Sequence, residues 1–368
     1  MVISPKPELD GVELCPHGAV DQAELGALGA GAVLDFSVNC HPLGAPQAVA
    51  VALASVDLSR YPDRRCTALR RHLCDRLGVS LEQIIVGNGS VELIWLLALA
   101  YLRPGDDVVV LGPTFGEYAR AARIQGARVT EHSAAEAQGF RLDLDEAAEL
   151  IRARRPRLVF LCNPNNPTGL YLEPEAVACL LGAGDQGLLV VDEAYLSLSG
   201  LSHVGRSPRG NCLLDWLDEG VVLLRSMTKD YGLAGLRLGY ALANPEVIAA
   251  LERVQPPWSV NSVAQAAGLV ALADEDHLAK GRQVVAEAKA YLVDELSRLA
   301  IAVVPSAANF ILVRVGNATA FRASLLARGC CVRDCTSFGL PHFVRVGMRP
   351  LAECRRLVGA IQEVIVDS

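Results

Sequence analysis

The sequence predicts an α/β fold, in which a large domain built on a three-layer, mostly parallel sheet is joined to a smaller α+β domain. Short apolar runs alternate with helical patterns from about residue 80 to 245, as expected for strands that are buried on both faces. Beyond Pro256-Pro257, longer helical patterns alternate with shorter apolar runs. The chain has 368 residues, which is enough for two domains or for one large domain with a smaller partner, and its 51% of hydrophobic residues allows a substantial core.

The elements can be predicted in chain order. Residues 1–45 are rich in Pro and Gly and should form an arm with one short extended piece. A large domain at 46–260 and a small domain at 261–368 are expected to follow. The predicted strands are 84–86, 107–111, 127–131, 158–162, 188–191, 221–224, 238–243, 302–304, 309–314, 331–333 and 343–346. The predicted helices are 46–56, 64–77, 90–102, 116–124, 144–153, 173–182, 259–274, 277–299, 318–327 and 350–365, and the one at 277–299 should join the two domains.

Composition excludes several classes of protein. The net charge of −7 gives the chain no overall attraction to nucleic acid or to an anionic membrane. No signal peptide pattern opens the sequence, and the apolar runs are too short to span a bilayer, so a cytoplasmic protein is expected. The eleven cysteines are scattered without zinc-type spacing. They are interpreted as reduced thiols, and no metal site is predicted.

The most informative stretch surrounds Lys229. This lysine comes just after the apolar run 221–224, where an α/β fold opens a crevice. Ser226 precedes it by three residues and Arg237 follows it by eight. A hydroxyl, an ammonium and a guanidinium suit a phosphate, and a lysine desolvated among cations can act as a nucleophile. Pyridoxal phosphate (PLP) requires this combination, although a solvated Lys and Arg beside a strand is the simpler alternative.

Two motifs upstream would complete a cofactor site. Gly89 and Ser90 follow a predicted strand and open a helix, whose free N–H groups favour a phosphate. Phe115 follows the run 107–111, where an aromatic ring can stack on a flat heterocycle. Taken singly, each has an ordinary interpretation, since many turns between strand and helix are Gly-rich and Phe115 could simply pack in the core.

Two polar motifs lie at the ends of the next two predicted strands. Asn166 belongs to the dense turn 163–169 and can donate to a phenolic oxygen. Asp192 emerges from an apolar strand and needs a partner; a protonated pyridine nitrogen is a suitable one. Tyr195 can reach the ring hydroxyl of the same cofactor. A plain turn and a helix-capping aspartate are the alternatives, but five such motifs in order, each at a strand end, are improbable by chance.

In this order the motifs resemble those of the fold-type I PLP enzymes, and the similarity to histidinol-phosphate aminotransferases and their relatives covers nearly the whole chain. The resemblance implies that Lys229 bonds the cofactor covalently. It assigns the cofactor ring to Phe115, Asn166, Asp192 and Tyr195, with Lys229, Asp192 and Tyr195 as the catalytic residues. It assigns the cofactor phosphate to Gly89, Ser90, Ser226, Arg237 and Tyr61. Tyr61 would reach that phosphate from a second subunit, which implies a homodimer.

A narrower resemblance concerns the threonine-phosphate decarboxylases of cobalamin biosynthesis. It rests on His17-Gly18 and on the segments 35–39, 257–261, 308–310, 332–335 and 343–349. It implies a PLP-dependent lyase that converts threonine phosphate into aminopropanol phosphate. The substrate residues it assigns are His17, Gly18, Asn39, Asn166, Arg333 and Arg345. The chain departs from that family's usual pattern at two positions. It has Ala19 where the family usually has Gly, and His41 where the family usually has Asn.

Three functions remain open, of which the decarboxylase is the first. If Arg333 and Arg345 bind a phosphate, the substrate carboxylate can be placed for cleavage; if they bind a carboxylate, the Cα–H bond is presented and transamination follows. The second possible function is therefore that of an aminotransferase, with histidinol phosphate as the expected amino donor. A PLP-binding regulator is the third, but the PLP-type motifs begin within about 65 residues of the start, which leaves no room for a DNA-binding domain.

Overall fold

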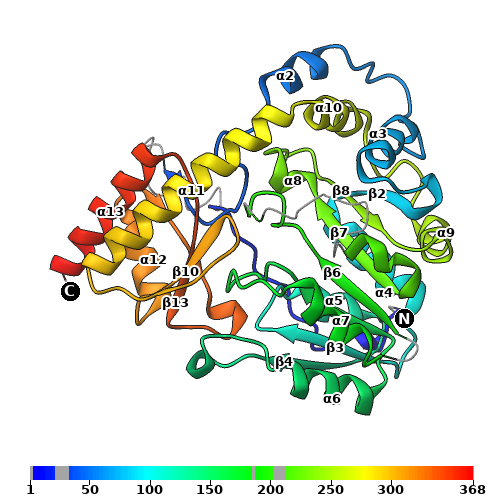
Figure 1. Ribbon diagram of the computed structural model, residues 1–368, viewed down its shortest axis with the longest axis horizontal. Coiled ribbons are helices and arrows are strands. Elements are labelled where there is room, and N and C mark those ends of the chain that lie inside the picture. Colours follow the sequence, from blue (N-terminus) through cyan, green and yellow to red (C-terminus); the bar gives the residue numbers. More distant parts are fainter. Residues whose placement is uncertain (1–2, 21–32, 185–186, 200, 202–212, 368) are drawn as a thin grey trace.

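The computed structural model describes residues 3–20, 33–184, 187–199, 201 and 213–367 (Figure 1). Its largest sheet has seven strands in the order β2-β8-β7-β6-β5-β3-β4. Strands β3 to β7 are mutually parallel, and β8 runs antiparallel to both of its neighbours. The predicted fold class is confirmed. The strands are β2 (Ile84–Asn88), β3 (Asp107–Gly112), β4 (Arg128–Ser133), β5 (Leu158–Cys162), β6 (Leu188–Asp192), β7 (Val221–Ser226) and β8 (Leu238–Leu242).

Two separate hydrophobic cores lie on the two faces of this sheet. Alternate residues of one strand enter different cores: Val159 and Leu161 of β5 belong to one, and Leu158 and Phe160 to the other. One face is covered by α3 (Thr67–Leu77), α6 (Leu144–Arg154), α7 (Pro174–Leu181) and α10 (Ser262–Ala273). The other is covered by α4 (Gly89–Tyr101), α5 (Glu117–Ile124) and α9 (Pro245–Val254). Because both faces of the sheet are covered, the carboxyl ends of its parallel strands are the place where polar side chains can form a binding site.

Helix α9 was not predicted, although its start carries a readable signal. Pro245 occupies the first turn, and the Asn244 side chain accepts a hydrogen bond from the Val247 backbone N–H. Both features are typical of a helix N-terminus. The helix is only ten residues long and is squeezed between a strand and the Pro256-Pro257 pair.

A second, antiparallel sheet has the order β12-β13-β10-β9. Its strands are β9 (Val303–Val304), β10 (Phe310–Arg314), β12 (Arg333–Asp334) and β13 (Phe343–Gly347), and its helices are α11 (Glu275–Arg298), α12 (Ala318–Ala327) and α13 (Leu351–Val366). The predicted strand at 331–333 is in fact divided. Its first part is β11 (Cys330–Cys331), which pairs in parallel with β1 (Leu34–Asp35) of the arm. The arm is therefore held to this part of the molecule by backbone hydrogen bonds.

Figure 1 shows how the long helix α11 runs from the helices beside the large sheet to those beside the small one. The remaining helices are α2 (Gln47–Ala54) and the one-turn α8 (Met227–Asp230). Short 3₁₀ helices span Pro7–Leu9, Leu81–Gln83, Glu136–Gln138, Leu213–Glu219 and Thr336–Phe338. The division into an arm at 1–45 and domains at 46–260 and 261–368 stays a prediction.

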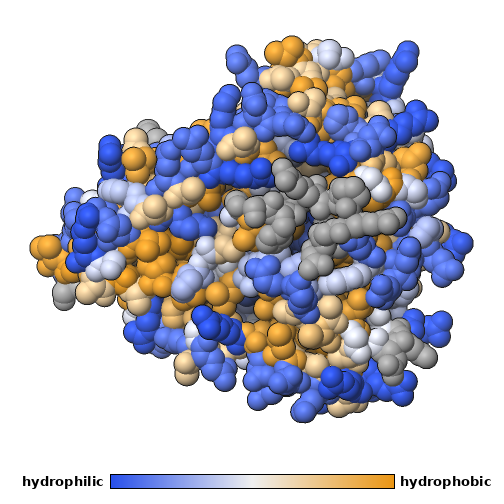
Figure 2. Space-filling view, in the orientation of Figure 1, coloured by the Kyte–Doolittle hydropathy of each residue, from blue (hydrophilic) through white to orange (hydrophobic). Residues whose placement is uncertain are grey.

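The surface carries both polar and apolar residues. Figure 2 shows hydrophilic residues interspersed with hydrophobic ones over the face that it presents. Among the described residues, no helix combines the length and the apolar character needed to cross a bilayer.

Candidate active site

A cavity of about 400 Å³ lies where the large sheet, the arm and the small sheet meet. It opens at the carboxyl ends of the parallel strands, where α/β folds bind their ligands. Most residues that the sequence assigned to a site line this cavity. They are His17, Gly18, Asn39, Ser90, Phe115, Asn166, Asp192, Tyr195, Ser226, Lys229, Arg237, Arg333 and Arg345.

Asp192 is the buried carboxylate of the cavity. It ends strand β6, accepts a hydrogen bond from the Tyr118 hydroxyl at 2.7 Å and another from the Ala194 backbone N–H at 3.0 Å. Burial raises the pKa of Asp192 to about 6, while these two hydrogen bonds and Lys229 oppose the rise. A buried carboxylate facing a cavity is stabilised by a cationic partner, and a protonated pyridine nitrogen provides one.

Tyr118 was not assigned a role from the sequence, although it belongs to the motif that contains Phe115. Its side chain is fully buried and its ring stacks on that of Phe160, with 5.1 Å between the centroids. The available signal was a hydroxyl on the buried face of a short helix, since such a group requires a hydrogen-bond partner.

Lys229 follows strand β7 on the one-turn helix α8. Burial lowers the pKa of Lys229, the guanidinium groups of Arg345 and Arg237 lower it further, and Cys40 and Asp192 oppose them. A larger fraction of this amine is therefore neutral than in an exposed lysine. The neutral form is the one that bonds to an aldehyde or accepts a proton.

The residues expected to hold a phosphate converge beside Lys229. Ser226 ends β7, Ser90 lies in the first turn of α4, and Arg237 reaches the same place. Gly89 contributes by lacking a side chain, because a Cβ at this position would lie 2.7 Å from Arg237 Nη2. Thr228 also lines the cavity and was missed from the sequence. This cradle of donors at a helix N-terminus fits the phosphate of PLP.

Two arginines form the opposite wall. Arg333 and Arg345 face each other in the register of strands β12 and β13. Arg345 is buried; it donates to the Asn166 side-chain oxygen and, at 2.7 Å, to the Ser37 carbonyl. Its Nε is buried without a hydrogen-bond partner among the described residues. Like charges opposite each other on neighbouring strands repel, so this pair suits a bound anion.

Tyr195 and Asn39 lie between the two walls. The Tyr195 ring meets Phe310 edge-on, with centroids 5.0 Å apart, and burial raises its pKa, which keeps the phenol protonated. Asn39 is buried, and its backbone carbonyl accepts a hydrogen bond from the Asn309 side chain at 3.1 Å. The Asn39 backbone is thus held in place, while its side-chain Nδ2 and Oδ1 are buried without a hydrogen-bond partner among the described residues and could bind a polar ligand.

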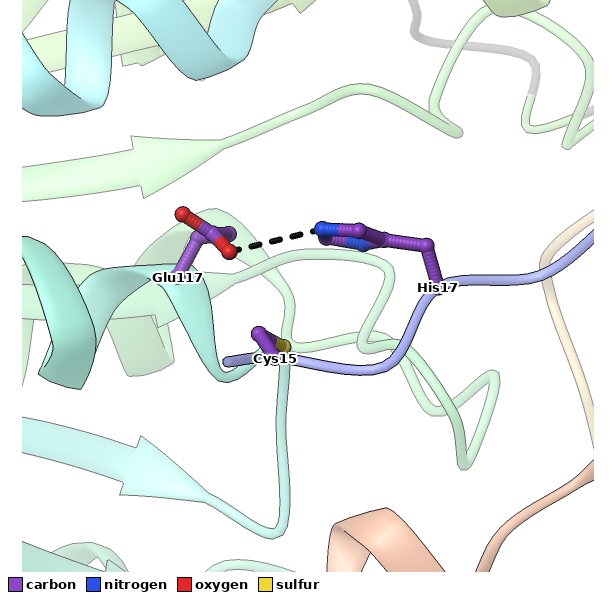
Figure 3. Close-up of side chains that lie close together, drawn as sticks. All are labelled: Cys15, His17 and Glu117. Carbon is purple, nitrogen blue, oxygen red and sulfur yellow. Dashed lines mark ion pairs between the residues drawn. The ribbon is translucent and has the colours of Figure 1, made fainter. Parts of the chain in front are cut away.

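His17 and Gly18 bring the arm to the cavity. The His17 ring lies 5.8 Å from that of Phe115, and its Nε2 lies 3.4 Å from a Glu117 carboxylate oxygen (Figure 3). A Cβ at Gly18 would lie 2.5 Å from the Ser37 carbonyl oxygen, so a larger residue would force this part of the arm away from Ser37.

Tyr61 lies apart from the cavity. Its side chain is 79% exposed and stacks on Trp258, with 4.5 Å between ring centroids. It does not line the cavity of its own chain. Its predicted contact with the cofactor of a second subunit stays a prediction.

Comparison with known proteins shows which family this chain resembles in sequence and in structure. The family model for aminotransferase class I and II matches residues 26–361. The histidinol-phosphate aminotransferase of Moorella thermoacetica is 40% identical over 92% of this chain and 87% of its own. A solved structure with the same fold is the crystal structure of histidinol-phosphate aminotransferase from Sinorhizobium meliloti in complex with pyridoxal-5'-phosphate. It superposes with a TM-score of 0.86 and 25% sequence identity, over 100% of this chain and 99% of its own.

These findings contradict the prediction of a threonine-phosphate decarboxylase. The structure of L-threonine-O-3-phosphate decarboxylase from Porphyromonas gingivalis covers 91% of this chain and 100% of its own, with a TM-score of 0.77. At 24% identity this likeness shows the fold alone. The prediction failed because the residues behind it indicate only an anion site. The presence of an anion site does not determine which bond at Cα is broken. The departures at Ala19 and His41 also weakened the resemblance to the decarboxylases.

Proposed function

This chain belongs to the aminotransferase class I and II family, and we propose that it transfers the amino group of histidinol phosphate to 2-oxoglutarate. As a member of that family it is a PLP-dependent enzyme. The observation that carries the proposal is the 40% identity to a histidinol-phosphate aminotransferase over almost the full chain. The paired arginines of the cavity support it, because the proposed amino donor carries a phosphate.

The cavity provides contacts for each part of the cofactor. Asp192 would pair with the pyridine nitrogen, Tyr195 and Asn166 would contact the ring hydroxyl, and Phe115 would stack on the ring. Ser226, Arg237, Ser90 and the backbone at Gly89 would hold the phosphate, and Lys229 would form the covalent link. When bound, PLP supplies an electron sink for charge that develops at the substrate Cα.

The substrate wall has to accept two different molecules in turn. Histidinol phosphate has a phosphate and no carboxylate, whereas 2-oxoglutarate has two carboxylates. The planar guanidinium forks of Arg333 and Arg345 can bind either anion through two parallel hydrogen bonds. His17, Gly18, Asn39 and Asn166 would line the same chamber. The need to bind both anions would account for the pairing of Arg333 with Arg345 on neighbouring strands.

Lys229 is the residue placed to move the proton. Its lowered pKa leaves part of the amine neutral and able to accept the Cα proton. The buried hydrogen bond between Tyr118 and Asp192 keeps that carboxylate fixed at the other end of the cofactor site. Fixing both groups reduces the reorganisation needed during the reaction.

A homodimer is part of the proposal. Tyr61 and Trp258 form an exposed aromatic pair on the surface. Exposed aromatic residues of this kind are enriched at protein interfaces. Tyr61 would extend from one subunit to the cofactor phosphate of the other.

The test is an assay of the PLP-loaded protein with histidinol phosphate, with and without 2-oxoglutarate. The expected result is glutamate formation that requires both substrates. Threonine phosphate serves as the comparison, and it should release no carbon dioxide. Glutamate formation from other amino donors but not from histidinol phosphate would overturn the substrate, and its absence with every donor would overturn the aminotransferase.

A further inference from the structure

Three potential metal ligands meet beside the cavity, and two of them line it. Cys15 and His17 belong to the arm, and Glu117 is the first residue of α5 (Figure 3). Each offers one ligand atom, and these atoms lie within 4.8 Å of one another. The spacing of the cysteines did not reveal this cluster, because its third member is a carboxylate about a hundred residues away from the other two.

We propose that Cys15, His17 and Glu117 bind a zinc-type divalent ion, and that this ion closes the substrate entrance. A thiolate, an imidazole and a carboxylate are the groups that bind Zn²⁺ in proteins. Bound Zn²⁺ holds its ligands at about 2.0–2.3 Å, so a small contraction of the cluster would complete the coordination. Three protein ligands leave the fourth position open to water or to an anion in the cavity.

Neighbouring residues already orient Glu117. The carboxylate is buried; one oxygen accepts a hydrogen bond from Trp95 Nε1 at 3.1 Å, and Arg120 contacts both oxygens at 3.3 and 3.4 Å. The other oxygen faces His17 at 3.4 Å. Such outer contacts hold a ligand in one rotamer, which favours metal binding.

The two arm ligands are also held in place. Pro16, the residue between them, accepts a hydrogen bond from Arg333 through its carbonyl at 2.8 Å. The arm packs so closely on the start of α5 that a Cβ at Gly116 would lie 2.8 Å from the Cys15 sulfur. Arg120 and Arg333 place positive charge nearby, which opposes a cation. We therefore expect reversible binding rather than a permanent structural metal.

The position of the cluster determines the consequence. Cys15 and His17 line the same cavity as Lys229. An ion that joins them to Glu117 would fix the arm against α5 and hold His17 at Glu117, where it could not turn to the substrate. The ion should therefore inhibit in competition with the amino donor.

The binding test uses the PLP-loaded protein without substrate. Calorimetric titration with Zn²⁺ should show one ion per chain at this site, and Co²⁺ should produce a visible absorption typical of tetrahedral coordination. Cys15→Ser should weaken binding at least about tenfold, since a ligand is lost. The matched control is Cys179→Ser, which removes an exposed cysteine on α7 away from the cavity. Unchanged binding in Cys15→Ser, or an equal loss in both variants, would overturn the site.

The functional test compares each variant with its own uninhibited rate. Zn²⁺ should raise the apparent KM for the amino donor in the unaltered protein and in Cys179→Ser, and a chelator should restore it. In Cys15→Ser the inhibitory concentration should rise at least about tenfold. If Zn²⁺ binds but does not inhibit, the proposal that the ion closes the substrate entrance is wrong. The metal titrations need no substrate, so an error in the proposed amino donor would not affect them.

Discussion

The two walls of the cavity are built in different ways. On the cofactor side, Ser226, Lys229 and Asp192 each lie at or just past the end of a strand of the large sheet. On the substrate side, Arg345 donates to the carbonyl of Ser37, 308 residues earlier in the sequence. Local sequence positions the first wall, whereas packing between the arm and the small sheet positions the second. The first wall should therefore tolerate changes in the arm, and the second should not.

The walls also differ in charge. The cofactor side combines a carboxylate whose pKa is raised and an amine whose pKa is lowered, both chiefly by burial. The substrate side has two opposed guanidinium groups, and the Nε of Arg345 has no partner within the described chain. The first wall suits one permanent cofactor, and the second suits anions that come and go. Substitutions on the two sides should therefore affect different quantities.

The largest effect is expected from Lys229→Ala. This change removes both the proposed covalent link and the proposed proton acceptor, so the rate of amino transfer should fall by more than about 10⁴-fold. The protein should remain folded, because Lys229 is not part of a hydrophobic core. Assay of glutamate formation with circular dichroism checks both statements. Activity close to normal would show that the cofactor wall has been assigned wrongly.

A substitution on the substrate side should separate the walls. Arg345→Ala removes a buried guanidinium that we propose binds the substrate anion, so kcat/KM should fall about 10²- to 10³-fold. The absorption of the bound cofactor should persist. Arg314→Ala is the matched control, because Arg314 lies on the same small sheet but points to Glu136 at the surface. Loss of the cofactor's colour in Arg345→Ala would show that this arginine belongs to the other wall.

The same difference explains what could be predicted from sequence. The residues assigned to the cofactor follow strands whose apolar runs are readable, so their convergence follows from the rule for parallel sheets. The pairing of β1 with β11 joins segments almost three hundred residues apart and leaves no local pattern. The contact of Glu117 with His17 joins segments a hundred residues apart and likewise leaves no local pattern, so it was missed. The reaction itself was mispredicted because the same anion site serves different bond cleavages.

The arm offers a test of stability. His41 is buried and stacks on His277 with 4.1 Å between ring centroids. Burial, and then the neighbouring imidazole, lower the pKa of His41 to about 4. The unfolded chain, with a pKa near 6.5, therefore binds more protons between these values. The free energy of unfolding should decrease as the pH falls through this window, by about 3 kcal/mol in total.

His41→Asn removes this titrating group, and asparagine is the residue usual in the enzymes that the arm resembles. Urea unfolding at pH 7 and pH 4.5 should show a smaller difference for the variant than for the unaltered protein. The double comparison cancels contributions from Asp192 and Asp230, whose raised pKa values act in the opposite direction. Equal differences for both proteins would mean that His41 does not limit the stability of the arm.

The smallest effect is expected from Tyr118→Phe, which changes one hydrogen bond on the cofactor side. The variant keeps the ring that stacks on Phe160 but loses the donor 2.7 Å from Asp192. The pKa of Asp192 should rise further, because that hydrogen bond lowers it, and the acidic limb of the pH–rate profile should move to higher pH. A shift of about one pH unit, with a tenfold loss of cofactor affinity, is expected. Tyr240→Phe, a buried change in the other core, should leave the profile in place; an equal shift in both variants would remove Tyr118 from the site.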